Sequence, residues 1–407
     1  MSRNPHWSSR YLFLLAAVGS AVGLGNIWKF PYVVGENGGG AFVLLYLFCI
    51  ALVGIPVLIA EILIGQSAQA NPVSAFAKLS RQFQASRLWV VFGYVGIIAG
   101  FLILSFYSVV AGWSLDYLSV FLQHQLSGYE AKQVARYFDA LLANPWQLLL
   151  WHTVFMLLTI AVVARGVKRG IEQLISWAMP LLFLLLIILV VYATQLNGFG
   201  KALTYLFTFD FSLVTIEVVL AALGHAFFTL SLGMGAMMVY GSYLSKNTPI
   251  ASLSLNIALM DTVIALLAGL AIFPLIFTHG LTPSSGPSLL FISLPNALLD
   301  LPFGQFFGVA FFLLLLIAAL SSAISILEPV VRFIEQNSRL TRASITVWVG
   351  VLIWLIGIAA LLSFNRWSDI TLLGDRHIFD SLDYLTDRKS TRLNSSHNRE
   401  SRMPSSA

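Results

Sequence analysis

Charged side chains are scarce in this chain, because Asp, Glu, Lys and Arg make up 10% of its residues while apolar types make up 58%. A soluble domain carries about 25% charged residues, so this shortage excludes a soluble globular protein. Cysteine is almost absent as well, and with Cys49 alone an intrachain disulfide is excluded. The histidines are scattered and form no His-Glu-x-x-His motif, so the sequence predicts no metalloenzyme. We therefore expect a membrane protein that is not an enzyme.

Apolar sequence is abundant, and it comes in runs long enough to cross a bilayer, for which about 20 residues suffice. The mean hydropathy of the chain is +0.84. These runs predict an all-α polytopic membrane protein. They cover residues 11–35, 41–66, 89–122, 147–164, 174–195, 214–244, 250–278, 303–331 and 344–363, and another begins near 378.

Positive charge predicts the orientation of these spans. Lys and Arg gather in the N-terminal tail and in every second loop, for example at Arg81, Arg87, Arg165 and Lys168, and they are fewer in the opposite loops. Because cytoplasmic loops carry the excess of Lys and Arg, we expect the N-terminus in the cytoplasm. The net charge of +5 is then a topology signal and not a nucleic-acid footprint. The short basic tail lacks a small-residue cleavage site, so we expect no signal peptide.

Two of the apolar runs are interrupted by glycine and polar residues. The first reads GSAVGLGNIWKFP over 19–31, and the sixth reads GHAFFTLSLGMGAMMVY over 224–240. Non-helical backbone at membrane depth is tolerated only where it is buried or lines a cavity. Five spans separate the two runs, so the second half is inverted relative to the first, and such paired interruptions indicate a binding site near the bilayer midplane. The alternative is that these glycines only permit close helix packing.

These segments resemble a known family of membrane transporters. GSAVGLGNIWKFPYVVGENGGGAFVLLY, GIPVLIAEILIGQ, FYSVVAGWSL, GHAFFTLSLGMGAMMVYGSYL and LSSAISILEP are similar, in this order, to motifs of the neurotransmitter:sodium symporter family, which has the LeuT-like fold. The resemblance covers residues 6–387. It implies sodium-coupled symport of neutral hydrophobic or aromatic amino acids by alternating access, in the bacterial inner membrane and without an organic cofactor.

The resemblance also implies how the chain is divided. Residues 1–10 are expected to form a cytoplasmic tail. Residues 11–196 would form the first inverted repeat of five helices, with its first helix broken. Residues 197–387 would form helices six to nine and the start of the tenth, with the sixth helix broken and the second repeat incomplete. The polar segment 388–407 is expected to be a non-native or disordered tail.

An amino-acid substrate is expected at the two interruptions. Amides freed by a helix break suit a carboxylate, and freed carbonyls suit an ammonium group or sodium, because hard cations take oxygen ligands. The mostly apolar lining favours a hydrophobic side chain, and the flexible Met234 predicts a tolerant pocket. The resemblance implies substrate-binding roles for Ala21, Leu24, Gly25, Ile103, Tyr107, Phe228, Thr229, Ser231, Met234, Ser322 and Ile326.

Two sodium ions are implied by the same resemblance. The first would be bound by the Ala21 carbonyl, Asn26, Thr229, Asp261 and the substrate carboxylate. The second would be bound by the carbonyls of Gly19, Val22 and Ala318 and the hydroxyls of Ser321 and Ser322. Taken alone, the two serines suit ordinary helix packing equally well.

Asp261 departs from the family pattern, because relatives commonly have asparagine there. Chloride-dependent members have serine one turn later, where this chain has Ala265. A carboxylate at mid-membrane needs a partner, and sodium is a suitable one. A fixed anion would also replace chloride, so we expect chloride-independent transport. The alternative is a purely structural carboxylate.

Further residues match gating and supporting positions of the family. Lys29 and Asp383 match an outer gate pair, although lysine lacks the bidentate fork of arginine. Glu61 is expected to accept hydrogen bonds from amides at the second break.

The inner side matches the pattern less closely. An Arg3–Glu335 pair is one interpretation, with Gln336 at the usual acidic position. His225 is interpreted either as a pH sensor or as a packing residue. Gly170 and Pro180 match a spacing linked to unwinding of the fifth helix, with a simple kink as the alternative.

Two other functions stay open at this point. A membrane sensor that binds an amino acid without transporting it, or a channel, would satisfy the same sequence. The expected partners are a small amino acid, sodium and the lipid bilayer, without nucleic acid. The exact substrate, the ion stoichiometry and the oligomeric state are not predicted.

Overall fold

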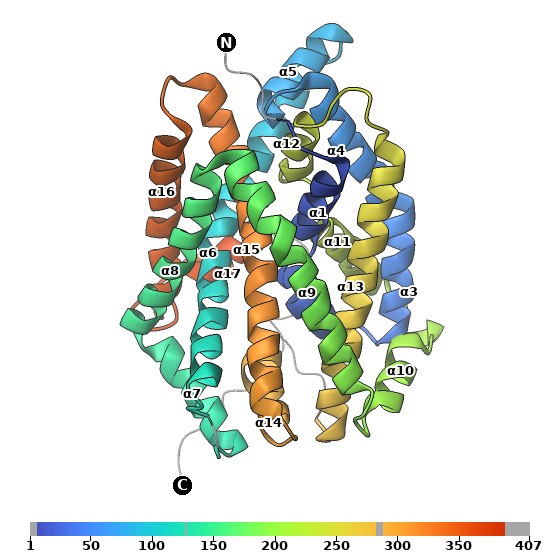
Figure 1. The fold of residues 1–407 in the computed structure, drawn as a ribbon, viewed down its shortest axis with the longest axis vertical. Helices are drawn as coiled ribbons and strands as arrows, with labels where there is room; N and C mark the ends of the chain where they lie inside the picture. Colours follow the sequence, from blue (N-terminus) through green and yellow to red (C-terminus); the bar gives the residue numbers. More distant parts are fainter. Residues whose placement is uncertain (1–5, 127, 282–287, 387–407) are drawn as a thin grey trace.

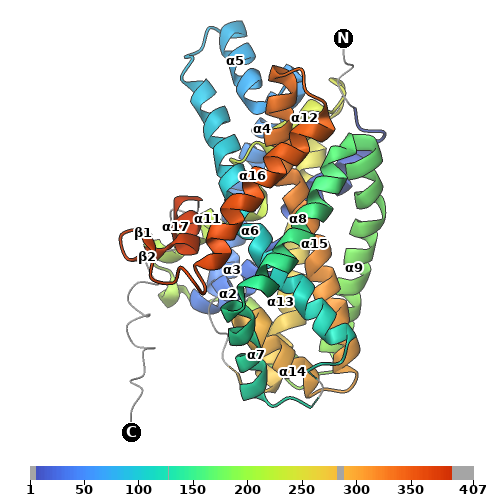
Figure 2. The same cartoon turned by 90° about the vertical axis from the view of Figure 1, so that its left-hand side faces the viewer.

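The apolar runs form long helices that stand side by side along the long axis of the molecule (Figure 1). The structure is a computed structural model that describes residues 6–126, 128–281 and 288–386. Within these ranges the chain is almost entirely helical. One short hairpin, β1 (Thr371–Leu373) with β2 (Arg376–His377), projects from one side together with α17 (Ile378–Thr386) (Figure 2).

Seven helices in the described ranges are long and apolar enough to cross a membrane. Each overlaps a run predicted from the sequence, although the span from Val167 begins seven residues before the predicted 174 and the span to Asn337 ends six residues after the predicted 331. They are α3 (Gly40–Cys49) continued through η2 (Ile50–Gly54) into α4 (Ile55–Ala68), α6 (Trp89–Leu122), α8 (Pro145–Ala164), η3 (Val167–Glu172) with α9 (Gln173–Ala193), α13 (Ile250–Thr278), α15 (Gly304–Asn337) and α16 (Arg342–Leu362).

The two runs with interruptions are broken helices. The first consists of α1 (Arg10–Ala21), then η1 (Gly25–Lys29) and α2 (Phe30–Glu36), and it bends by 46° at the break. The second consists of α11 (Ile216–Thr229) and α12 (Ala236–Ser242). In the gap between them Ser231, Gly233 and Gly235 have φ values of 54°, 84° and 78°, which a helix cannot accommodate.

Short helices cover the two ends of the bundle. The helix α5 (Pro72–Gln82) lies at the same end as the N-terminus, whereas α7 (Ala131–Ala143), α10 (Phe199–Phe207) and α14 (Leu294–Leu299) lie at the opposite end (Figure 1). Two further turns, η4 (Phe211–Leu213) and η5 (Leu289–Ser293), precede α11 and α14.

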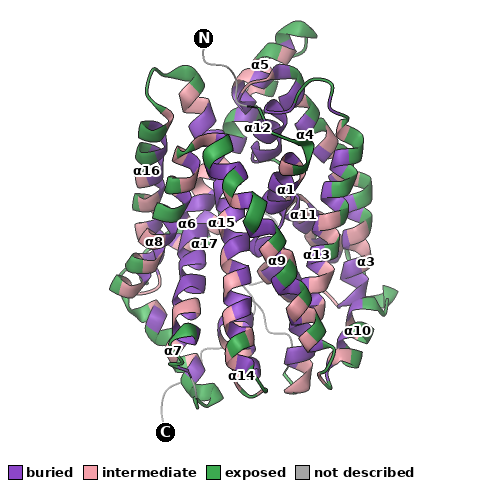
Figure 3. Cartoon of the chain, in the orientation of Figure 1, coloured by how far each residue is buried: buried purple, intermediate pink, exposed green. Residues whose placement is uncertain are grey.

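The core of the molecule lies around α15 and the two broken helices (Figure 3). Of the apolar stretch of α15, 78% is buried, against 33% for α8. The helix α15 packs against α6, α1 and α9, and α12 packs against α4. The exposed apolar side chains lie on the outer helices, where a bilayer would cover them.

The segment with Gly170 and Pro180 is helical throughout, as the wide turn η3 followed by α9. A side chain at 170 would lie 2.0 Å from the Val162 carbonyl oxygen, so the glycine is needed for close approach to α8. The role of this segment in unwinding stays a prediction. The prediction for residues 388–407 concerns a segment outside the described residues.

Candidate functional site

A small cavity lies where the two broken helices meet α6 and α15. It measures about 20 Å³, which is room for about one water molecule. Every residue expected to contact the substrate lines it except Thr229. Ser20 and Gly23, which were not among the expected substrate-binding residues, line it too. The lining consists of Ser20, Ala21, Gly23, Leu24, Gly25, Ile103, Tyr107, Phe228, Ser231, Met234, Ser322 and Ile326.

The glycines at the first break allow the chain to approach this cavity closely. A Cβ at Gly23 would lie 2.2 Å from Ser322 Oγ and 3.3 Å from the Tyr107 hydroxyl oxygen. A Cβ at Gly25 would lie 3.0 Å from the Phe228 ring. A side chain at position 23 would therefore clash with Ser322, and one at position 25 would press against the Phe228 ring. The Tyr107 hydroxyl itself donates to the carbonyl of Ala319 on α15 (3.3 Å).

On one side of the cavity, Asp261 from α13 collects polar groups from three other elements. Asn26 Nδ2 donates to Asp261 Oδ1 (2.8 Å) and to its carbonyl oxygen (3.1 Å). Thr229 Oγ1 lies 3.0 Å from both carboxylate oxygens and 3.0 Å from Asn26 Oδ1. Tyr46 from α3 adds a longer hydrogen bond to Oδ2 (3.4 Å).

This Asp261 cluster is buried, since Asn26, Thr229 and Asp261 each have 0% exposure. Thr229 Oγ1 lies 3.0 Å from each of three other side-chain oxygens of the cluster, and oxygen atoms are the ligands that a hard cation takes. Residues 26, 229 and 261 were all expected at the first sodium ion, and the structure brings them together from the two broken helices and α13.

Elsewhere at the cavity, α1 and α15 meet at the residues expected around the second sodium ion. Ser322 Oγ donates to the carbonyls of Ser20 (3.2 Å) and Gly19 (3.5 Å). Ser321 Oγ donates to Ala318 O (3.0 Å), and a Cβ at Gly19 would lie 3.3 Å from Ser321 Cβ. Val22 ends α1 with an extended backbone (ψ 91°), so its carbonyl no longer belongs to a helical ladder.

Known proteins share this architecture. A model of the sodium:neurotransmitter symporter family matches residues 4–136 and 129–366. The chain belongs to the sodium:neurotransmitter symporter family. The symporter family and the LeuT-like fold predicted from the motifs are thus confirmed.

Individual relatives match over most of the symporter chain. It is 44% identical to the uncharacterized sodium-dependent transporter YhdH of Bacillus subtilis, over 93% of this chain and 83% of the relative. It is 36% identical to an uncharacterized sodium-dependent transporter of Haemophilus influenzae, over 93% of this chain and 84% of the relative. The crystal structure of MhsT in complex with L-phenylalanine matches with a TM-score of 0.88 and 46% identity, covering 95% of this chain and 87% of that one.

Of the residues expected to support the break and form the outer gate, Glu61 and Lys29 contact the second broken helix or its gap, and Asp383 lies on another element. Glu61 on α4 accepts a hydrogen bond from the Gly233 amide (2.6 Å), inside the gap between α11 and α12. The Lys29 ammonium lies 4.2 Å from the centre of the Phe228 ring. Asp383 lies on α17, which packs against α6 and α16.

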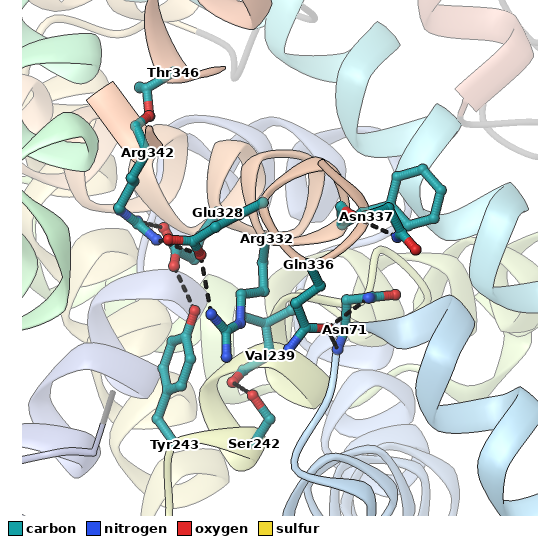
Figure 4. A network of polar contacts seen from close by, with 12 residues as sticks. Asn71, Val239, Ser242, Tyr243, Glu328, Arg332, Gln336, Asn337, Arg342 and Thr346 are labelled. Carbon is teal, nitrogen blue, oxygen red and sulfur yellow. Dashed lines mark hydrogen bonds and ion pairs between the residues drawn. The ribbon is translucent and has the colours of Figure 1, made fainter. Parts of the chain in front are cut away.

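At the end of the symporter that carries the N-terminus, α12, α15 and α16 are joined by a polar network (Figure 4). Glu328, with 0% exposure, accepts a hydrogen bond from the Tyr243 hydroxyl (2.6 Å) and forms an ion pair with Arg342. Arg342 Nε also donates to the Val163 carbonyl of α8 (2.9 Å). The sequence reading had missed this network, although an acid inside an apolar helix, as in LSSAISILEP, signals a buried partner.

Glu335 and Gln336, the residues considered for an inner gate, form contacts within the same region. Glu335 pairs with Arg332 (2.9 Å) and Arg342 (3.5 Å), and Gln336 Oε1 accepts from Asn71 N (2.8 Å) and Nδ2 (2.6 Å). Arg3 lies outside the described residues.

The N-terminal segment is held nearby. Ser8 N and Oγ both donate to the Glu172 carboxylate, each at 2.7 Å, and Trp7 Nε1 donates to Tyr240 O (3.0 Å).

His225 packs against the rings of Tyr46 (5.2 Å between centroids) and Phe30 (5.7 Å).

Proposed function

We propose that this protein carries neutral hydrophobic or aromatic amino acids together with sodium across the bacterial inner membrane by alternating access. The observation that carries the proposal is the cavity between the two broken helices, with two oxygen clusters beside it. A zwitterion uses both kinds of group that a helix break provides, since amides suit its carboxylate and carbonyls suit its ammonium group and sodium. The residues that line the cavity are mostly apolar, and MhsT, at 46% identity, binds L-phenylalanine.

The proposed roles follow the cavity and the two oxygen clusters. Leu24, Gly25 and Tyr107 bind the substrate carboxylate. The Asp261 cluster binds one sodium ion, and Gly19, Val22, Ala318, Ser321 and Ser322 bind a second. The apolar part of the lining binds the substrate side chain.

Chloride is not required in this proposal. Asp261 supplies a fixed negative charge beside the first sodium ion, and Ala265, one turn later, is buried and offers no hydroxyl. The polar network of Glu328 and Arg342 supports an arrangement closed at the end that carries the N-terminus, which we propose is the cytoplasmic end because of the Lys and Arg bias.

Uptake of labelled L-phenylalanine by proteoliposomes tests this function. We expect accumulation under an inward sodium gradient, and loss of accumulation when potassium replaces sodium or an ionophore collapses the gradient. Flux that does not saturate would indicate a channel, and binding without accumulation would indicate a sensor.

A pair of matched variants tests the proposed first sodium site. Thr229→Val removes the hydroxyl beside Asp261 and keeps the shape of the side chain, so we expect sodium-dependent uptake to be lost. Thr159→Val removes an equally buried hydroxyl that bonds only its own helix at Phe155 O (3.0 Å), and uptake should persist. Equal activity of the two variants would contradict the proposed first sodium site.

A further inference from the structure

Ser20, near the end of α1, joins the two broken helices to α15. Its carbonyl oxygen accepts hydrogen bonds from Ser231 Oγ in the gap of the second break (2.8 Å) and from Ser322 Oγ on α15 (3.2 Å). Its hydroxyl donates to Ser325 Oγ on α15 (2.8 Å). Ser325 Oγ in turn donates to the carbonyl of Ser322 (2.8 Å). All four serines are buried.

The bonds to the carbonyl of Ser20 have a local explanation. The last carbonyls of a helix have no partner within it, and α1 ends at Ala21, so the hydroxyls of Ser231 and Ser322 satisfy an acceptor that the break leaves open. The bond between Ser20 Oγ and Ser325 Oγ has no such explanation. It satisfies no backbone group of α1, and it joins two helices 305 residues apart in the sequence.

What this bond fixes is the separation of α1 from α15. Ser325 lies one helical turn after Ser322 on α15, and Ser20 follows Gly19 on α1. The bond is therefore the next connection along the same helix pair that holds Gly19, Ser321 and Ser322. Two connections between the same two helices are coupled, because the first to form orders the helices for the second.

We propose that the Ser20–Ser325 hydrogen bond positions α1 against α15 so that the neighbouring carbonyls and hydroxyls bind sodium. Both are positioning residues, since neither is in the set of proposed sodium ligands. This inference rests on the proposed second sodium site. It adds that the sodium affinity of that site depends on a hydrogen bond outside it.

The test is the sodium dependence of the purified full chain carrying Ser325→Ala, Ser20→Ala or both. Removing either hydroxyl leaves the proposed ligands in place, so we expect the sodium concentration for half-maximal L-phenylalanine binding to rise about fivefold, the effect of one net hydrogen bond. At saturating sodium, binding by the Ser325→Ala variant should return to the wild-type level, because Ser325 is not among the residues that line the cavity. The double variant should shift no further than either single variant, because all three lack the same bond.

A second readout needs no substrate. Sodium that binds the folded state raises the thermal unfolding midpoint, and this rise should need more sodium in each of the three variants. Ser108→Ala is the matched control, since Ser108 is equally buried but bonds only carbonyls of its own helix at Leu104 and Ser105. It should leave both measurements unchanged.

The possible outcomes distinguish a failure of the proposed function from a failure of the proposed role of the Ser20–Ser325 bond. A wild-type chain that neither responds to sodium nor accumulates L-phenylalanine would overturn the proposed function itself. A wild-type chain that responds to sodium, with single variants that match it, would overturn the role of the Ser20–Ser325 bond alone. Additive shifts in the double variant would also overturn it, because the two hydroxyls would then act separately.

Discussion

Asp261 is a buried carboxylate whose hydrogen-bond partners, Asn26, Thr229 and Tyr46, are all neutral. A bound sodium ion would supply the positive charge that these partners lack. We predict that Asp261→Asn raises the sodium concentration for half-maximal uptake by at least about tenfold, because a buried ion that loses its charged partner is destabilised by several kcal/mol. Uptake by this variant should become responsive to chloride.

The control for Asp261→Asn is Asp116→Asn. Asp116 is also a buried carboxylate in an apolar helix, and it accepts hydrogen bonds from Tyr137, Gln147 and Trp151 at 2.6–2.7 Å. Its neutralisation should leave the sodium dependence unchanged. Uptake by the wild type in gluconate medium that falls severalfold below uptake in chloride medium would contradict a fixed-charge role for Asp261.

Met234 is the residue of the second break that we expect to contact the substrate side chain. It lines the cavity and is 8% exposed. We predict that Met234→Phe shifts preference from tryptophan towards leucine by about 1–3 kcal/mol, the usual effect of overfilling a packed site. Competition of unlabelled leucine, phenylalanine and tryptophan with labelled phenylalanine measures this shift. An unchanged order of the three competitors would mean that Met234 does not contact the substrate side chain.

At the residue scale, the resemblance to the family predicted which side chains lie near the two breaks, but not every partner that they have. Asn26, Thr229 and Asp261 could be named because their positions match the family pattern, and the structure brings their side chains together. Ser20 could not, since serine is unremarkable among small residues and its partner Ser325 is 305 positions away. The partner of Gln336 is likewise Asn71, 265 positions away, and such pairs depend on tertiary packing that one sequence does not display.

At the scale of elements, the break between α11 and α12 depends on backbone that only glycine adopts readily. Gly235 has φ 78°, and a Cβ there would lie 2.7 Å from Pro72 Cγ. We predict that Gly235→Ala destabilises the protein by about 1–2 kcal/mol from the left-handed backbone alone, with the clash against α5 in addition. Gly224→Ala in α11 is the control, because no atom lies within 4 Å of the added Cβ.

Thermal unfolding in detergent compares the two glycine variants. Alanine at 224 should be neutral or stabilising by up to about 1 kcal/mol, because alanine favours a helix interior. A Gly235→Ala variant that melts at or above the wild-type temperature would show that the break does not require this conformation.

Sequence patterns predicted the long elements and missed the short ones for one physical reason. A span of about 20 apolar residues is imposed by bilayer thickness and is visible in composition. The helices α5, α7 and α10 have 11, 13 and 9 residues and lie at the ends of the bundle. Their stability comes from packing on the spans rather than from their own length, so no long apolar run in the sequence predicts them.

For the whole molecule, the testable quantity is orientation in the membrane. The helix α6 has 34 residues and is about 50 Å long at 1.5 Å per residue, so it crosses a hydrocarbon core of about 30 Å and leaves both ends in water. Ala85 precedes it and Gln125 follows it, and both are exposed. The Lys and Arg bias predicts that Ala85 is cytoplasmic and Gln125 external.

Single cysteines at these two positions report the orientation. The only natural cysteine, Cys49, is buried, and Cys49→Ala gives a background without thiols. In intact cells a membrane-impermeant maleimide should label the Gln125→Cys variant and not the Ala85→Cys variant, and both should react once the membrane is permeabilised. The opposite labelling pattern would mean that the orientation in the membrane is the reverse of the predicted one. The polar network of Tyr243, Glu328 and Arg342 lies at the same end as the N-terminus and α5 (Figure 4), so it would then close the external end.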